Sequence, residues 1–203
     1  MVKSVKFTSI NSQNATTITT SSQTCISIPG LITTFDGNYE TLGDVSLDFN
    51  WNILTGITLT VNPGHTFTIL SKLTVNGKIR VQGALVNLSE NSLNITGSGA
   101  VIIEKDATLI NGDGFALNGS LRNSGSLVVY GTLNNKSGSK ITNKEKGEVS
   151  YVGTIDNNGT ITNQGTFYKS VLGGDFKGKP SGIALTNGLF GILSTTYTNT
   201  KTI

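Results

Sequence analysis

Glycine recurs along most of this 203-residue chain at intervals of 19 to 22 positions. From the second of these glycines onward, an aliphatic residue follows one to three positions later. The glycines are Gly37, Gly56, Gly77, Gly99, Gly119, Gly138 and Gly159, and the aliphatic residues are Ile57, Ile79, Val101, Leu121, Ile141 and Ile161. A period of this length, built from residues that favour strands, is typical of a chain that coils and stacks on itself.

A shorter period of six residues lies inside each coil. Gly119, Gly125 and Gly131 each precede a hydroxyl residue and a leucine, and three such hexads, with small insertions, make a coil of about 20 residues. We therefore predict an all-β fold: a single-stranded, three-sided β-solenoid (a parallel β-helix) of about six coils, of either hand, with glycine at the corners. The predicted stacks are Leu121, Ile141 and Ile161 on one face, Leu127, Val149 and Phe167 on the second, and Leu133 and Ile155 on the third.

The composition agrees with an all-β repeat. Only 13% of the residues are charged, against roughly 25% in an average soluble domain. Solubility must therefore come from Asn, Thr, Ser and Gly. Ala and Glu, which favour helices, are scarce, whereas Thr, Val, Ile and Leu are abundant. No long helix is expected.

The repeat divides the chain into three regions. Residues 1–44 are irregular and rich in Thr and Ser, and we expect them to cap one end of the stack. Residues 45–168 form the expected solenoid, in which Trp51 packs over the first full coil. Residues 169–203 break the pattern with several glycines and a proline, and we expect a C-terminal cap or an assembly segment there.

The C-terminal region contains adjacent apolar residues. Two adjacent residues cannot both face inward on one strand, so at least one of each pair should be exposed or meet a partner. A segment that folds back and buries both is the alternative. The predicted assembly residues are Leu189, Phe190, Ile192 and Leu193, and the predicted partners are copies of this chain or other structural proteins.

Asparagine recurs four residues after glycine. These positions are Asn87, Asn123, Asn135, Asn157 and Asn163. A polar row that binds a ligand is one interpretation. The interpretation we favour is an Asn at each corner, which tolerates left-handed backbone and hydrogen-bonds to its neighbours in a ladder.

Charge and hydropathy exclude several kinds of partner. The net charge is +3, but the 15 Lys and Arg are scattered, whereas nucleic-acid surfaces need clustered cations. No apolar run reaches the roughly 18 residues of a membrane span. Residues 1–7 lack the apolar region of a secretory signal, so either a leader has been removed or the protein leaves its cell without one. We expect no nucleic-acid binding and no membrane insertion.

The sequence contains no recognisable catalytic, cofactor-binding or metal-binding motif. His, Cys and acidic residues do not cluster with ligand spacing, and no glycine-rich phosphate loop is present. The single cysteine, Cys25, lies in a strand-like stretch and is expected to be a small buried hydrophobe. We therefore predict no catalytic residue, no cofactor and no metal.

Two classes of enzyme with β-helical folds are poorly matched. Acyltransferases with a left-handed helix need a histidine base and place glycine directly after the inward aliphatic residue. Here glycine precedes that residue by two positions, and the only histidine, His65, lies in a turn sequence. Polysaccharide lyases and hydrolases need clustered acids, or a basic residue beside metal-binding Asp. Asp106, Asp113 and Arg122 come nearest to such a cluster and keep a polysaccharide-processing enzyme as a further alternative.

One tract resembles the repeats of a known class of protein. Residues 153–167 read Gly-Thr-Ile-Asp-Asn-Asn-Gly-Thr-Ile-Thr-Asn-Gln-Gly-Thr-Phe, which resembles the Gly-Thr-Ile-x-Asn-x repeats of adhesin-type β-solenoids, and residues 73–83 are similar. Such repeats occur in bacterial surface passengers and in structural proteins of large viruses and phages. The resemblance covers roughly residues 45–168. It implies a non-catalytic structural or adhesive component of a virion, appendage or cell surface, and it transfers no site residue.

Paired threonines support an alternative function. Thr-x-Thr occurs at Thr58, Thr66 and Thr160, and both threonines of a pair face outward if the residue between them faces inward. Stacked threonine rows of this kind are used by ice-binding β-helices. Coils between residues 77 and 158 lack the pair, so the row is interrupted. A glycan- or ice-binding module that uses a flat face is the alternative.

Overall fold

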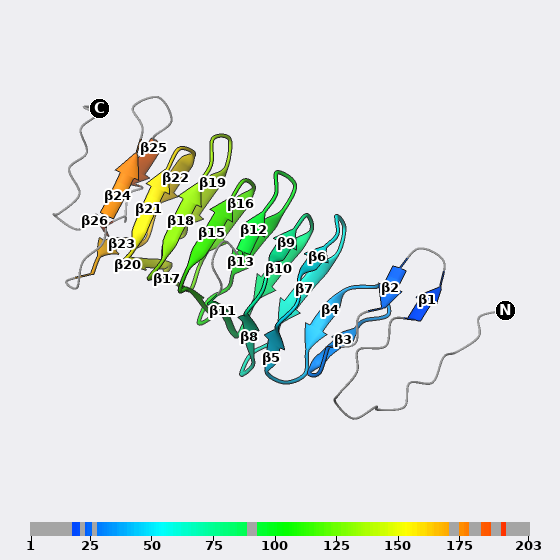
Figure 1. Ribbon diagram of the computed structural model, residues 1–203. Helices are drawn as coiled ribbons and strands as arrows, with labels where there is room; N and C mark the ends of the chain where they lie inside the picture. The colour runs from blue at the N-terminus through cyan, green and yellow to red at the C-terminus, as the bar shows by residue number, and fades with distance from the viewer. Residues whose placement is uncertain are drawn as a thin grey trace.

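The chain forms a stack of short strands along one axis (Figure 1). The structure is a computed structural model that describes residues 18–20, 23–25, 28–88, 93–170, 175–178, 184–187 and 192–193. These residues form 26 strands, and none of them is helical. Within this part of the chain, no helix has the length and hydrophobicity of a membrane span.

Each turn of the chain adds one strand to each of three sheets. The first sheet contains β3 (Leu31–Thr33), β4 (Tyr39–Thr41), β7 (Thr58–Val61), β10 (Lys78–Val81), β13 (Ala100–Ile103), β16 (Ser120–Asn123), β19 (Lys140–Asn143), β22 (Thr160–Asn163) and β25 (Ala184–Asn187). The second sheet contains β5 (Val45–Leu47), β8 (Thr66–Ile69), β11 (Ala84–Asn87), β14 (Thr108–Asn111), β17 (Ser126–Val129), β20 (Glu148–Tyr151), β23 (Thr166–Lys169) and β26 (Ile192–Leu193). The third sheet contains β6 (Trp51–Ile53), β9 (Leu73–Val75), β12 (Leu93–Ile95), β15 (Gly114–Leu117), β18 (Thr132–Asn135), β21 (Thr154–Asn157) and β24 (Asp175–Gly178).

The predicted all-β, three-sided parallel solenoid is therefore confirmed. It has about seven turns where about six were expected, because the strands continue past residue 168. Every pairing between successive coils is parallel; in the first sheet only β3 and β4, at one end, pair antiparallel. The two remaining strands, β1 (Ile18–Thr20) and β2 (Gln23–Cys25), form a separate antiparallel pair, so Cys25 ends a strand.

The predicted stacks have the register that the repeat indicated. Leu121, Ile141 and Ile161 are aligned in the first sheet. The second sheet aligns Leu127, Val149 and Phe167, and the third aligns Leu133 with Ile155. All of these side chains are buried, because alternate residues of each strand face the interior of the prism.

Aromatic residues lie at both ends of the buried column. Trp51 is 6% exposed, packs edge-on against Tyr39 at 5.0 Å and stacks with Phe67 at 6.4 Å, as expected for a residue that covers the first full coil. At the other end Tyr151, Phe167 and Phe176 form a second cluster. These rings fill the interior where the aliphatic stacks end.

The buried asparagines form ladders at all three corners, which confirms the predicted hydrogen bonds. The expected left-handed backbone is wrong, because none of these asparagines has a positive φ; each still belongs to its extended strand. Asn123 Nδ2 donates to Asn143 Oδ1 at 2.8 Å, and Asn143 Nδ2 donates to Asn163 Oδ1 at 2.7 Å. Similar pairs join Asn87 to Asn111 at 2.8 Å and Asn135 to Asn157 at 2.6 Å. Each of these side chains ends a strand and faces inward. The polar row is therefore interior, and it does not offer its amides to an external ligand.

The parallel stacking extends past residue 168, where the regular region was expected to end. Strands β24, β25 and β26 continue the third, first and second sheets. Of the predicted assembly residues, Ile192 and Leu193 form β26, aligned with Thr166 and Phe167. Leu189 and Phe190 lie outside the described residues. The assembly contact itself stays a prediction.

Candidate functional site

The outward surfaces of the three sheets differ in chemistry. On β7 to β22 the first sheet presents four cations and no carboxylate. These are Lys78, Arg80, Arg122 and Lys140. The outward positions of the second sheet from β8 to β23 are uncharged except for Glu148. The third sheet presents mainly amides and hydroxyls, such as Asn52, Thr74 and Asn134.

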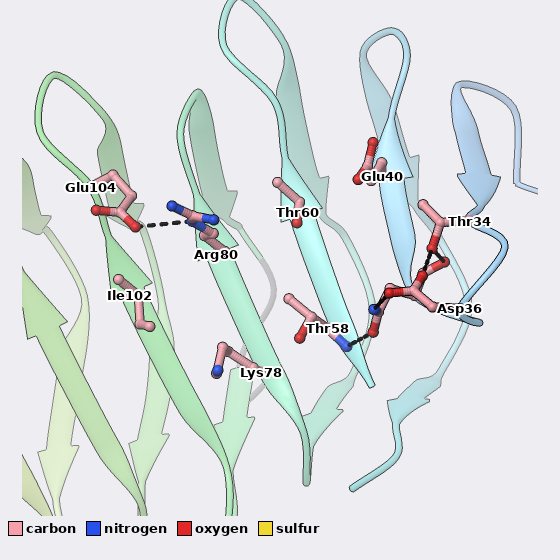
Figure 2. A pocket seen from close by; sticks show the side chains of 10 residues that line it. Thr34, Asp36, Glu40, Thr58, Thr60, Lys78, Arg80, Ile102 and Glu104 are labelled. Carbon is pink, nitrogen blue, oxygen red and sulfur yellow. Dashed lines mark hydrogen bonds and ion pairs between the residues drawn. The ribbon is translucent and has the colours of Figure 1, made fainter. Parts of the chain in front are cut away.

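A shallow polar depression lies on the first sheet near the β3–β4 end (Figure 2). Its volume is about 440 Å³. The lining combines three carboxylates, two cations, three hydroxyls, one amide and one aliphatic side chain. The residues are Asp36, Glu40, Glu104, Lys78, Arg80, Thr34, Thr58, Thr60, Asn38 and Ile102.

One wall of the depression is the turn between β3 and β4. The Asp36 carboxylate accepts a hydrogen bond from Thr34 Oγ1 and a second from Asn38 Nδ2 at 2.7 Å. Asn38 Oδ1 in turn accepts from the Thr58 amide at 2.7 Å. Gly37 supplies the left-handed backbone that the turn requires, with φ of 81°. The turn is thereby fastened to β7, which holds the Asp36 carboxylate beside the sheet.

The floor of the depression is a column of outward residues on four neighbouring strands. Glu40, Thr60, Arg80 and Ile102 are aligned by the parallel register. Arg80 Nε lies 2.9 Å from Glu104 Oε1, and both side chains are partly exposed, so this ion pair contributes little to stability. The remaining guanidinium nitrogens of Arg80 have no hydrogen bond to described residues, and they are free to donate to a ligand.

The hydrogen bonds at the turn change the acidity of Asp36. Donation from the Thr34 hydroxyl, with a smaller contribution from Asn38, stabilises the carboxylate and lowers the pKa of Asp36 below its ordinary value of 3.8. A depressed pKa contributes stability that is present above pH 3.8 and is lost as the pH falls through the folded-state value. Asp36 is therefore an ionised acceptor at neutral pH.

We expect the Asp36 carboxyl carbon to titrate with a midpoint below 3.8 in an NMR pH titration, and Thr34→Ala to raise that midpoint. The reason is the loss of the largest stabilising hydrogen bond to the carboxylate. Thr33→Ala removes an exposed neighbouring hydroxyl that does not bond to Asp36 and serves as the control. An unchanged midpoint in Thr34→Ala would contradict this account of the turn.

The residues singled out as the nearest approach to an acidic cluster do not come together. Asp106 lies at the corner between the first and second sheets, with φ of 65°, and Asp113 lies at the corner between the second and third. Arg122 faces outward from β16. His65 is at a corner next to β8, half-buried. Among the described residues, no group of three or more His, Cys, Asp or Glu is placed to hold a metal ion.

The threonine pairs face outward as expected, but they do not form a continuous row. Thr58 and Thr60 flank the buried Leu59 on β7. The aligned positions on β10 are Lys78 and Arg80. A cationic strand therefore separates the first threonine pair from the rest of the first sheet.

The depression as a whole is not indicated by the repeat pattern of the sequence. The sequence does indicate one part of it: Glu40, Thr60 and Arg80 are spaced by one coil of 20 residues, and this spacing places them in one outward column. Asp36 and Asn38 belong to a turn outside the repeat, so no period indicates that they lie beside β7.

The chain matches no protein-family model, no curated protein and no solved structure.

Proposed function

We propose that this protein is a non-catalytic adhesive component of a virion, appendage or cell surface, and that the depression on the first sheet binds a glycan. The solenoid is the scaffold that presents the site. The observation that carries this proposal is the composition of the depression, in which acceptors and donors surround one aliphatic side chain.

The lining has the groups that recognise sugars. Carboxylates of Asp36 and Glu40 accept hydrogen bonds from hydroxyls, and Arg80 and Lys78 donate to hydroxyl and ring oxygens. Ile102 offers an apolar surface to the C–H groups of a sugar ring. With three carboxylates and two cations, the depression has no strong excess of either charge, which favours a neutral glycan over a polyanion.

The scaffold holds these groups in place before a ligand binds. Glu40, Thr60, Lys78 and Arg80 are on strands that are paired on both sides, and Asp36 is fastened through Asn38 to β7. Side chains on rigid elements lose little freedom when a ligand binds, so more of the interaction energy appears as affinity. The open, shallow form also suits one segment of a longer chain of sugars.

Glycan-array binding followed by calorimetry with a bound oligosaccharide tests the proposal. Arg80→Ala should weaken binding by about 10- to 100-fold, because a hydrogen bond to a charged donor contributes about 1.5–3 kcal/mol. Arg122→Ala is the matched control, since Arg122 is an exposed arginine on the same sheet but outside the depression.

If the wild-type protein binds no glycan on a broad array, the proposal of a glycan-binding site is wrong. So would equal losses of affinity in Arg80→Ala and Arg122→Ala. The proposed location is tested separately, by whether the protein co-purifies with particles or envelope fractions of the producing cell; a protein that stays in the soluble fraction contradicts it.

A further inference from the structure

The outward surface of the second sheet carries an apolar column. Val86, Ile110 and Val128 occupy aligned outward positions on three successive strands, β11, β14 and β17. Each of them is half-buried by its neighbours. The column continues with Thr68 on one side and Ser150 on the other, so a hydroxyl residue stands at each end of the aliphatic run.

A second apolar row follows the same sheet at its corner with the third sheet. The residue directly after each strand is Leu70, Leu88, Gly112, Tyr130 or Val152, and equivalent backbone hydrogen bonds align all five. Leu70, Leu88 and Tyr130 are 47%, 54% and 56% exposed. Large side chains with such exposure, adjacent to an apolar column, form a patch that is typical of an interaction surface.

Both rows are symmetric about β14. Read in either direction from Ile110, the column gives an aliphatic residue and then a hydroxyl residue. Read in either direction from Gly112, the corner row gives a large apolar side chain and then a second apolar side chain. A surface with this property can face a copy of itself about a two-fold axis that lies along β14, because such an axis exchanges the strands on its two sides.

We propose that the second sheet is the interface of a homodimer, in which two copies pack face to face about this axis with their solenoids antiparallel. Ile110 then faces Ile110 of the second copy, and Val86 faces Val128. At the rim, Leu88 comes opposite Tyr130. The interface lies on a different sheet from the glycan site, so it does not depend on the proposed function.

Charge favours a second copy on this surface. Two chains with a net charge of +3 repel each other, and the outward cations of the first sheet would face each other if those surfaces met. The second sheet presents only Glu148 among charged outward residues of β8 to β23, and Tyr168 Oη donates to it at 2.7 Å. Two copies can therefore bring the outward strand positions of this sheet together without placing like charges opposite each other; the exposed Lys105 and Asp106 lie beyond the strand, at the corner before β14, and are paired with each other.

The size of the surface sets the expected strength. The seven strands from β5 to β23 are placed symmetrically about β14. With a spacing of about 4.8 Å and a length of about 13 Å each, they give a footprint of roughly 400 Å² per copy before the corner row is added. Stable specific interfaces bury about 1,200–2,000 Å² in total. The dimer should therefore be reversible and dependent on concentration.

Sedimentation equilibrium of the full chain, at concentrations up to about 1 mM, where even a millimolar Kd is measurable, tests the proposal. The wild type should dimerise, and Ile110→Lys should weaken the dimer by at least about 10-fold, because it places two lysines opposite each other at the axis. The control is Ala116→Lys, which places a lysine at an outward position of the third sheet in the same coil, aligned with the uncharged Asn94 and Asn134. A monomeric wild type, or equal effects of the two variants, would overturn the proposal.

A charge pair tests the two-fold arrangement itself. Val86→Lys combined with Val128→Glu should restore the dimer that Val86→Lys alone weakens, because each lysine then faces a glutamate of the other copy, and this pair occurs twice in the dimer. Val86→Lys combined with Val128→Lys should remain monomeric. Circular dichroism of each variant establishes that it is folded. If the two double variants associate equally, the antiparallel arrangement about β14 is wrong.

Discussion

Gly119→Ala is expected to destabilise the solenoid by at least about 3 kcal/mol, because there is no space for a methyl group at this corner. A Cβ at Gly119 would lie 2.2 Å from the carbonyl oxygen of Gly99 and 2.4 Å from that of Thr96. The Gly99 carbonyl already accepts a hydrogen bond from the Ser120 amide at 3.1 Å, so it cannot move without breaking the ladder between coils. Urea denaturation measures the loss, and amide exchange shows whether it is centred on residues 95–122.

Gly138→Ala is the matched control, because Gly138 belongs to the same 20-residue series but has a different reason to be glycine. Its φ is 82°, and an added Cβ would meet nothing within 4 Å. The substitution therefore costs only the strain of a left-handed alanine, about 1–2 kcal/mol. If Gly119→Ala is no more destabilising than Gly138→Ala, close approach between coils is not what selects glycine at position 119.

This contrast shows what the sequence can and cannot indicate about the fold. A period of 20 residues identifies the coils, and the strand alternation identifies the inward residues, so the stacking of Leu121 on Ile141 and Ile161 was predictable. The period does not distinguish Gly119 from Gly138, since crowding and left-handed backbone both favour glycine.

The asparagine ladders were predictable only in part. A spacing of four residues after glycine finds Asn87 and Asn123, but it misses Asn111 and Asn143. Asn111 follows Ala107, which takes the place of the glycine, and Asn143 lies five residues after Gly138. Both become evident only when the strands are aligned, because the ladder depends on position along the strand and not on distance from the corner glycine.

The depression was less predictable than the fold because it combines two kinds of structure. Arg80 and Ile102 belong to the repeat, and their shared column can be read from their spacing. Asp36 reaches the same place through an antiparallel turn whose geometry depends on hydrogen bonds among Thr34, Asn38 and Thr58. Contacts of that kind, between an irregular segment and the end of a repeat, leave no period in the sequence.

Asn143→Ala is expected to lower the free energy of unfolding by about 3–5 kcal/mol, since each buried polar group left unpaired costs about 1–3 kcal/mol. Asn143 is fully buried in the middle of its ladder. Its Nδ2 lies 2.7 Å from Asn163 Oδ1, 2.9 Å from the Thr166 carbonyl oxygen and 3.0 Å from the Gly147 carbonyl oxygen, and its Oδ1 accepts from Asn123 Nδ2 at 2.8 Å. Alanine removes all four contacts and leaves a cavity. The loss is measured by urea denaturation, with Asn134→Ala as the control, because Asn134 faces outward from β18 and its truncation should change stability by less than about 0.5 kcal/mol.

Asn143→Asp separates the hydrogen bonds of the ladder from simple packing. Aspartate has nearly the same shape, but its carboxylate has no donor for the oxygens of Asn163, Thr166 and Gly147. Burial without a cation raises the pKa of the new carboxyl in the folded protein above its value of about 4 in the unfolded chain. The substitution therefore becomes more destabilising as the pH rises above about 4, and less destabilising below that pH, where the carboxyl is protonated. We therefore expect Asn143→Asp to be at least as unstable as Asn143→Ala at pH 7 and to recover part of the difference near pH 4, where a protonated carboxyl can donate one hydrogen bond. Equal stability of Asn143→Asp and wild type at pH 7 would show that the ladder contributes by shape alone.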